Sequence, residues 1–200
     1  MENDKKKVEL FFENHALKVS RFSKSEMRRG KTPDFKVHSD SSNDLLFYCE
    51  VKSIKKDEWL GIQIAAVSPG EIAGGLRKDP IFNRLTGDIY EASKQFDAVN
   101  PDLAFPNVLA FVNHDSACGF LGLIAILTGN AMTEDSGAIP IYRLYSEGRI
   151  KGKKDRIHLF IWLDDFKPLR LLFSQKNENH HKLLCSYLNI NPVTIKIIDS

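Results

Sequence analysis

The chain has 200 residues, a length that fits one domain and allows a sizeable hydrophobic core. Hydrophobic residues make up 42% and charged residues 27%, as in ordinary globular proteins, and the formal net charge is only +2. A net charge this small does not by itself indicate a nucleic-acid-binding protein, so the local distribution of charge matters more. No apolar run is long enough to cross a bilayer, and we expect no membrane partner.

In its first half the sequence predicts two helices and several strands. The pattern favours a helix over residues 4–16, a strand over 17–22, a polar basic loop, strands over 34–38 and 45–54 joined by a turn, a looped-out segment over 55–83, a helix over 85–100 and a buried strand over 106–114. The strands over 34–38 and 45–54 are expected to form a hairpin, because the residues between them favour turns.

The second half continues the mixture of helices and strands. The pattern favours a buried helix over 117–127, strands over 156–163 and 168–173, a helix over 180–188 and a last strand over 193–199. We therefore expect one α/β domain of mixed α+β character that spans residues 1–200, around a mostly buried sheet.

The cysteines and histidines give no sign of a disulfide or a zinc site. Cys49, Cys118 and Cys185 are widely spaced in apolar surroundings, and an odd number without paired spacing argues against both kinds of site. A cytoplasmic protein is the simplest interpretation. The histidines lack metal-ligand spacing, so His114 and the pair His180-His181 are expected at the surface or in loops.

The strand over 45–54 combines an apolar approach with a charged end. Side chains of a strand alternate between its two faces. We expect one face to be apolar, made by Leu45, Phe47, Cys49 and Val51. The other face is expected to become polar at its end, and it is made by Leu46, Tyr48, Glu50 and Lys52. Across the hairpin, Asp34 stands at the start of the partner strand, so its carboxylate is expected close to that of Glu50.

Two adjacent carboxylates and a lysine suit metal-assisted chemistry. Carboxylates repel one another unless a cation lies between them, and Mg²⁺ favours such oxygen ligands. The carbonyl of Val51 is a candidate backbone ligand. Lys52 places a positive charge where it can orient an attacking water or stabilise charge on a phosphate.

This constellation resembles the PD-(D/E)XK nuclease superfamily, which has the restriction-endonuclease-like fold. Pro33-Asp34 and Glu50-Val51-Lys52 carry the resemblance, which covers about the first 115 residues. The family core runs helix, three strands, helix and strand, and the elements predicted over residues 4–115 follow that order if residues 55–83 are an insertion. Residues 116–200 then form a C-terminal extension packed on the same domain.

The resemblance also implies roles for two further residues. The first helix of the family often brings an acidic residue to the metal, and Glu9 and Glu13 lie one turn apart on one face, with Glu9 favoured by its position. The helix after the third strand often carries a residue that contacts substrate or nucleophile. Lys94 and Gln95 occupy that place, and Gln95 is the better candidate.

Basic residues gather in front of the expected site. The segment 18–36 holds seven basic residues and two acidic ones, and the candidate nucleic-acid-binding residues within it are Arg21, Lys24, Arg28, Arg29 and Lys31. A second cluster over 149–156 suits phosphate binding and a solubilising loop equally well.

These observations together favour a Mg²⁺-dependent nuclease, with Mn²⁺ as a substitute ion. Asp34, Glu50, Lys52 and Gln95 would be its catalytic residues, with Asp34, Glu50, Val51 and Glu9 around the metal. The resemblance favours DNA over RNA, and a second copy of the chain is a candidate partner. A non-cleaving module that binds nucleic acid or protein is the main alternative, and a structural protein with an ordinary hairpin is a third.

Overall fold

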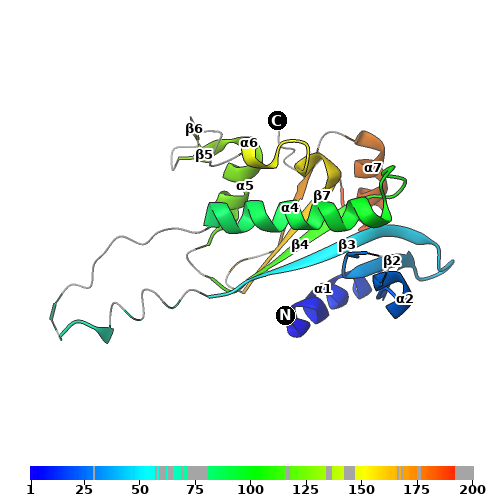
Figure 1. Ribbon diagram of the computed structural model, residues 1–200, viewed down its shortest axis with the longest axis horizontal. Coiled ribbons are helices and arrows are strands. Elements are labelled where there is room, and N and C mark those ends of the chain that lie inside the picture. The colour runs from blue at the N-terminus through cyan, green and yellow to red at the C-terminus, as the bar shows by residue number, and fades with distance from the viewer. Residues whose placement is uncertain are drawn as a thin grey trace.

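The chain is described by a computed structural model over residues 1–28, 30–56, 58, 62, 65–68, 70–71, 81–115, 118–133, 137–141, 147–165, 167, 169–174 and 177–191. Within these residues the fold is mixed α/β, around a six-stranded sheet of order β1-β2-β3-β4-β7-β8 (Figure 1). The strands of this sheet are β1 (Leu17–Ser20), β2 (Phe35–Ser39), β3 (Leu45–Ile54), β4 (Asn107–Asn113), β7 (Leu159–Asp164) and β8 (Arg170–Phe173). The helices are α1 (Glu2–Glu13), α2 (Lys24–Met27), α4 (Ile81–Val99), α5 (Phe120–Thr128), α6 (Glu147–Ile150), η2 (Lys154–Arg156, a 3₁₀ helix) and α7 (Glu178–Tyr187).

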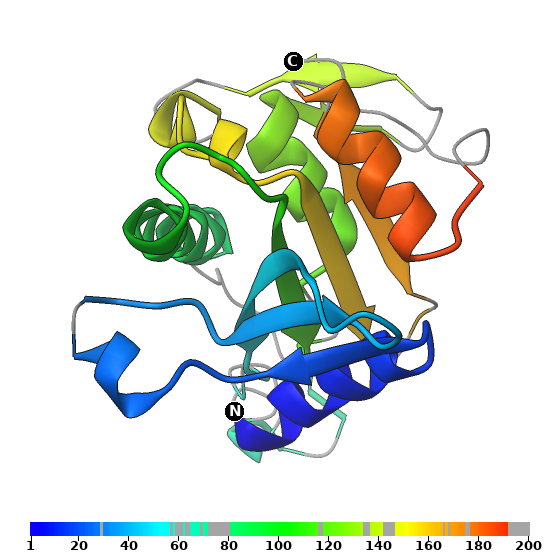
Figure 2. The same cartoon turned by 90° about the vertical axis from the view of Figure 1, so that its right-hand side faces the viewer.

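The sheet combines an antiparallel and a parallel part. Strands β1, β2 and β3 pair antiparallel, β3, β4 and β7 pair parallel, and β8 closes the sheet antiparallel to β7. Figure 2 shows the strong twist that carries the sheet from β1 and β2 round to β7 and β8. Strands from both halves of the chain therefore belong to one sheet.

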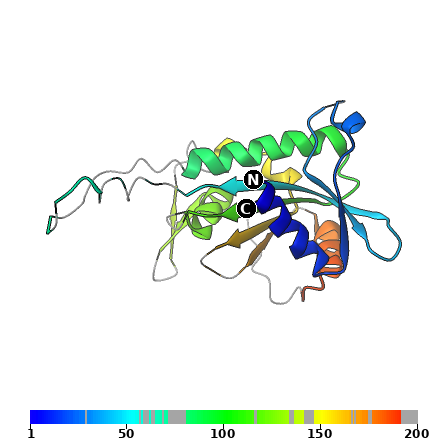
Figure 3. The same cartoon turned by 90° about the horizontal axis from the view of Figure 1, so that it is seen from below.

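Helices cover both faces of the sheet, as Figure 3 shows for α4 on one side and α1 with α7 on the other. The α4 face, which α4 and α5 cover, has a core that includes Leu85, Ile89 and Phe96. The α1 face, which α1 and α7 cover, has a core that includes Val8 and Leu184. Each fully buried apolar side chain of this size stabilises the fold by about 1.5–3 kcal/mol relative to exposure.

Strand β4 lies in the middle of the sheet, and all seven of its residues are buried. Its side chains alternate between the two cores, with Leu109 and Phe111 on the α4 face and Val108, Ala110 and Val112 on the α1 face. Burial on both faces explains why this strand reads as a continuous apolar run rather than an alternating one.

The alternation expected for β3 is right from Phe47 onward and wrong before it. Phe47, Cys49 and Val51 pack on the α1 face, and Tyr48 packs on the α4 face. Leu45 and Leu46 lie on the faces opposite to those expected. The reason is a register shift between β2 and β3, which leaves Leu46 without a partner residue and reverses the alternation at that point.

Several boundaries differ from those that the sequence predicts. Helix α4 begins at Ile81, inside the segment expected to loop out, and the basic loop contains the short helix α2 with a capping box between Ser23 and Glu26. The short strands β5 (Asn130–Met132) and β6 (Ala138–Pro140) form a pair that was not expected. The last predicted strand, 193–199, lies outside the described residues, as does most of 55–80. Among the described residues, the helices lack the combination of length and hydrophobicity that crossing a membrane requires.

Candidate functional site

The site forms where β3 extends beyond its partner β2. The ladder between them ends with Phe35 opposite Cys49, whereas β3 continues to Ile54. The backbone of β3 beyond that point therefore needs other partners on this side. Asp34, directly before β2, supplies one of them, because its Oδ2 accepts a hydrogen bond from the Val51 N–H at 3.0 Å.

Asp34 and Glu50 are joined in the opposite direction as well. The backbone N–H of Asp34 donates to Oε2 of Glu50 at 3.0 Å. The hairpin thus brings the two carboxylates together as the sequence predicts, and backbone hydrogen bonds fix their relative position.

Glu50 is buried, with 3% of the residue exposed, and its other carboxylate oxygen is an ion-pair partner. The Nζ of Lys52 lies 2.8 Å from Oε1 of Glu50. Burial and, after it, the charge of Asp34 raise the pKa of Glu50, Lys52 and Gln95 oppose this rise, and the net result is a pKa of about 7. A cation that displaced the proton would relieve both unfavourable effects on the ionised carboxylate.

Gln95, on helix α4, contacts Lys52 on the face of the sheet that α4 covers. Its Oε1 accepts a hydrogen bond from Lys52 at 3.4 Å, and its Nε2 donates to the carbonyl of Thr32 at 3.0 Å. The helix thereby connects Lys52 to the segment that leads into Asp34. Gln95, which the sequence favours over Lys94, is thus the residue of this helix that contacts Lys52.

A further acidic residue, Asp88, belongs to the surroundings of Lys52 and was not predicted. Burial raises the pKa of Asp88, and the charges of Lys52 and Arg84 partly offset this effect. Asp88 lies seven positions before Gln95, which is two turns of α4 and hence the same face. The helical spacing from Gln95 could have identified it.

The contribution of α1 differs from the expected one. Glu9 pairs with Lys6 at 3.0 Å, and Glu13 lies 3.9 Å from the same ammonium group. The α1 residue that contacts the site is Lys5, which forms an ion pair with Oδ1 of Asp34. Lys5 is four positions before Glu9 and shares its helical face, so the sequence identified the face but not the charge that it presents to Asp34.

The carboxylate oxygens of Asp34 and Glu50 are of the ligand type that a hard divalent cation prefers. Among the described residues, no group of three or more His, Cys, Asp and Glu side chains is placed to hold a metal ion. Mg²⁺ often binds through only one or two carboxylates, with waters and substrate phosphate as its other ligands. Asp34 and Glu50 provide two such carboxylates. The Val51 carbonyl lies on the same side of β3 as the Val51 N–H, which donates a hydrogen bond to Asp34.

The basic residues of the β1–β2 connection lie at the surface. Lys24 and Arg28 are exposed, Arg21 pairs with Glu2, and Lys31 pairs with Glu91 at 2.9 Å. Arg29 lies outside the described residues. Lys24 and Arg28 are thus exposed basic residues of this connection that a phosphate backbone can reach.

The second basic cluster has a structural role at two of its positions. Lys154 is buried and donates to the carbonyl of Leu127 at 2.8 Å and to Glu147 at 3.2 Å. Arg156 pairs with Asp97 of α4 at 2.6 Å. These two charges hold α4, α5 and α6 together, which neither of the two interpretations of this cluster anticipated.

His180 is more enclosed than expected, whereas His114 lies in a loop as expected. His180 is buried, and its Nδ1 lies 3.0 Å from Nε2 of His158. His114, just after β4, bridges two carboxylates: Nε2 lies 2.9 Å from Asp4, and Nδ1 contacts Asp165. This contact ties α1 to the carboxyl ends of β4 and β7.

Comparison with known proteins adds no assignment to this geometry. No family model, no curated protein and no solved structure matches the chain.

Proposed function

We propose that the chain is a metal-dependent nuclease that hydrolyses phosphodiester bonds, with DNA as the favoured substrate, on a restriction-endonuclease-like core. The observation that carries the proposal is the convergence of Asp34, Glu50 and Lys52 at the end of one hairpin. Lys52 lies 2.8 Å from Glu50, and the Asp34 N–H lies 3.0 Å from the same carboxylate.

The order of elements supports the finer description of the fold. Helix α1, strands β1, β2 and β3, helix α4 and strand β4 follow one another along the chain, with the short α2 between β1 and β2. This is the helix, three strands, helix and strand of the core that the sequence resembles. Strands β7 and β8 and helix α7 are additions to it, and residues 55–80 occupy the place of the proposed insertion.

The residues of the site divide the chemistry between them. Asp34, Glu50 and the Val51 carbonyl would hold Mg²⁺, which when bound polarises a phosphate and lowers the pKa of water. The ammonium of Lys52 orients the attacking water and stabilises the negative charge that develops on the phosphate. Gln95 keeps that ammonium in place, because its amide is fixed at the far end by the Thr32 carbonyl.

The exposed cations Lys24 and Arg28 would hold the strand that carries the scissile phosphate. Such contacts act through charge and counterion release, so they contribute affinity without selecting a sequence. They belong to the connection that leads into Asp34, and a strand bound there would run past the site.

A cleavage assay tests the proposal directly. The purified chain is incubated with labelled single-stranded and duplex DNA and RNA in Mg²⁺ or Mn²⁺, and then in chelator. We expect metal-dependent cleavage that Glu50→Gln abolishes, while Lys56→Ala, which removes an exposed lysine four positions beyond Lys52, leaves it unchanged. No cleavage of any of these substrates in either metal would overturn the proposal.

A non-cleaving nucleic-acid-binding module is the second candidate, and the ion pair between Lys5 and Asp34 favours it. With Lys5 on one oxygen of Asp34 and the Val51 N–H on the other, that carboxylate is satisfied without a metal. In such a module, nucleic-acid binding would be measurable and salt-dependent in chelator, and neither Mg²⁺ nor Mn²⁺ would change the thermal stability of the chain.

A further inference from the structure

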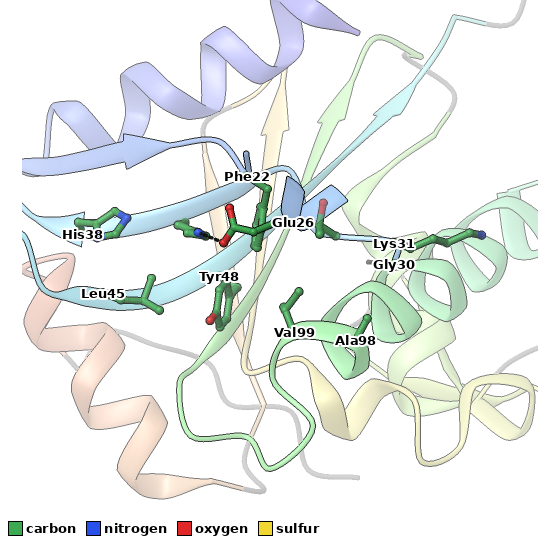
Figure 4. A pocket seen from close by; sticks show the side chains of 11 residues that line it. Phe22, Glu26, Gly30, Lys31, His38, Leu45, Tyr48, Ala98 and Val99 are labelled. Carbon is green, nitrogen blue, oxygen red and sulfur yellow. Dashed lines mark hydrogen bonds and ion pairs between the residues drawn. The ribbon is translucent and has the colours of Figure 1, made fainter. Parts of the chain in front are cut away.

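A pocket of about 380 Å³ lies beside the candidate site on the α4 face. Its walls are the segment that leads from β1 to β2, the β2–β3 hairpin and the last turn of α4. The lining residues are Phe22, Glu26, Gly30, Lys31, Thr32, Lys36, His38, Leu45, Tyr48, Ala98 and Val99. In Figure 4 the side chains of Phe22, Tyr48 and Val99 converge, whereas Lys31 extends away from them.

The pocket has an aromatic and aliphatic floor. The rings of Phe22 and Tyr48 are stacked, with centroids 6.0 Å apart and planes at 23°, and Phe105 supports Tyr48 edge-on. Leu45 and Val99 pack against the same core. These rings are held by their neighbours and are largely buried, with 7% of Phe22 and 9% of Tyr48 exposed, so the floor needs little ordering when a ligand binds.

The rim of the pocket is polar and carries more positive than negative charge. Lys36 lies over the Phe22 ring at 4.7 Å and also pairs with Glu26, and His38 adds an imidazole. An apolar floor with a few polar groups around its edge is the usual composition of a small-ligand site, and the volume lies within the usual range. The occupant best suited to it is flat and aromatic, with hydrogen-bonding groups on its edge.

The pocket is close to the candidate site in two independent ways. Tyr48 and Glu50 are alternate residues of β3 on the α4 face, so their backbones are about 7 Å apart along the strand. Thr32 is one of the residues that line the pocket, and its carbonyl accepts a hydrogen bond from the amide of Gln95. Lys52 is two residues beyond Glu50 on the same face, so a ligand in the pocket is about one or two nucleotides from a phosphate at Lys52.

We infer that this pocket accepts one unpaired nucleobase of the strand whose phosphate lies at the candidate site. The inference deepens the proposed function and rests on it. A base inside an intact duplex is stacked and paired and cannot enter a pocket of this kind, so the substrate would be a single strand, or a duplex with an unpaired position beside the scissile phosphate. Stacking on an aromatic floor tolerates every base, so the pocket would select strand structure and not sequence.

Binding in chelator tests the inference separately from cleavage. The probe is a single-stranded oligonucleotide with one 2-aminopurine, a fluorescent base whose emission reports stacking. Ala98→Trp fills the pocket from an exposed position at the end of α4, and Ala98→Ser is the matched control. We expect the wild type and Ala98→Ser to change the emission on binding, and Ala98→Trp to bind about tenfold more weakly without that change.

Two outcomes would overturn the inference: equal affinity of the wild type for the single strand and the matching intact duplex, or unchanged binding and emission with Ala98→Trp. Thermal unfolding of Ala98→Trp checks that the variant is folded. If the pocket binds the probe but no metal supports cleavage, the nuclease proposal fails and the pocket remains. If cleavage occurs and the emission never changes, the pocket inference fails and the nuclease proposal remains.

Discussion

The backbone N–H of Asp34 donates to a carboxylate oxygen of Glu50 at 3.0 Å, although the two residues are sixteen positions apart. In return, the Asp34 carboxylate accepts from the backbone N–H of Val51 at 3.0 Å. Each acidic side chain is thus held by the backbone of the other strand. The two carboxylates remain neighbours through the architecture of the hairpin, and not through the choice of one side-chain rotamer.

A metal that binds this pair should stabilise the fold, because an ion that binds only the native state shifts unfolding by mass action. At a Mn²⁺ concentration of one hundred times Kd, the stabilisation is about 2.7 kcal/mol. Asp34→Asn keeps an acceptor for the Val51 N–H but removes the charge, so the metal-induced shift in thermal midpoint should disappear. The exposed Asp40→Asn is the matched control and should retain it. A full shift in Asp34→Asn would remove Asp34 from the metal site.

Lys52 should be needed for cleavage and not for substrate binding. Removing a preorganised charge at a reacting centre costs about 10²–10³ in rate, so Lys52→Ala should lose that much single-turnover cleavage. Lys52→Arg should also be slow, because a planar guanidinium does not replace a compact ammonium. Nucleic-acid affinity in chelator should change little.

The conditions of that experiment matter because Lys52 also acts on Glu50. Lys52 lowers the pKa of Glu50, so its removal raises that pKa and favours the protonated carboxyl. Comparison at a pH well above 7 separates the loss of chemistry from a loss of ionised Glu50. Cleavage by Lys52→Ala near the wild-type rate under those conditions would show that the Glu50–Lys52 pair is only a charged strand end.

The basic connection between β1 and β2 should supply affinity that depends on salt. Arg28→Ala should weaken binding to all sequences alike and reduce the slope of log affinity against log salt by about one unit for the lost phosphate contact. Lys151→Ala, at an exposed position of the other basic cluster, should change neither quantity. A changed sequence preference with an unchanged slope would mean that Arg28 contacts base edges.

Much of this site could be predicted because strand periodicity and hairpin pairing are local properties. The alternation of Phe47, Tyr48 and Glu50, and the pairing that brings Asp34 opposite the end of β3, follow from the sequence around them. The bulge at Leu46 could not be predicted from alternation, because the sequence pattern does not show which residue of β3 lacks a partner in β2. Leucines occupy both sides of the shift, so either register buries an apolar side chain.

The contacts that involve distant segments were beyond the sequence. Lys5 meets Asp34 only because α1 packs across β3, and Lys154 is buried only because α5 and α6 surround it. A helical face can be recognised from spacing alone, but the sign of the charge required at each position depends on its partner in the fold. This is why the sequence favours Glu9 on a face where Lys5 makes the contact.

The bridge from Asp4 through His114 to Asp165 should make stability depend on pH. Hydrogen bonding to Asp165 raises the pKa of His114, burial opposes this, and Asp4 adds a second hydrogen bond. Ser53 also donates to Asp4 at 2.6 Å, and Lys7 pairs with Asp165 at 2.6 Å. A histidine can donate through both ring nitrogens only when it is protonated, so contacts from both nitrogens to carboxylates favour the protonated form.

The sign of the effect follows from the raised pKa. The contribution of His114 is fully present below its unfolded pKa of 6.5 and is lost as the pH rises through the higher folded value. His114→Gln should therefore lower the free energy of unfolding by about 1.5–3 kcal/mol at pH 5.5, as for hydrogen bonds to charged groups, and by clearly less at pH 9. Urea unfolding of both proteins across this range measures the difference. A difference that is constant with pH would mean that His114 stabilises the fold by packing and not by its charge.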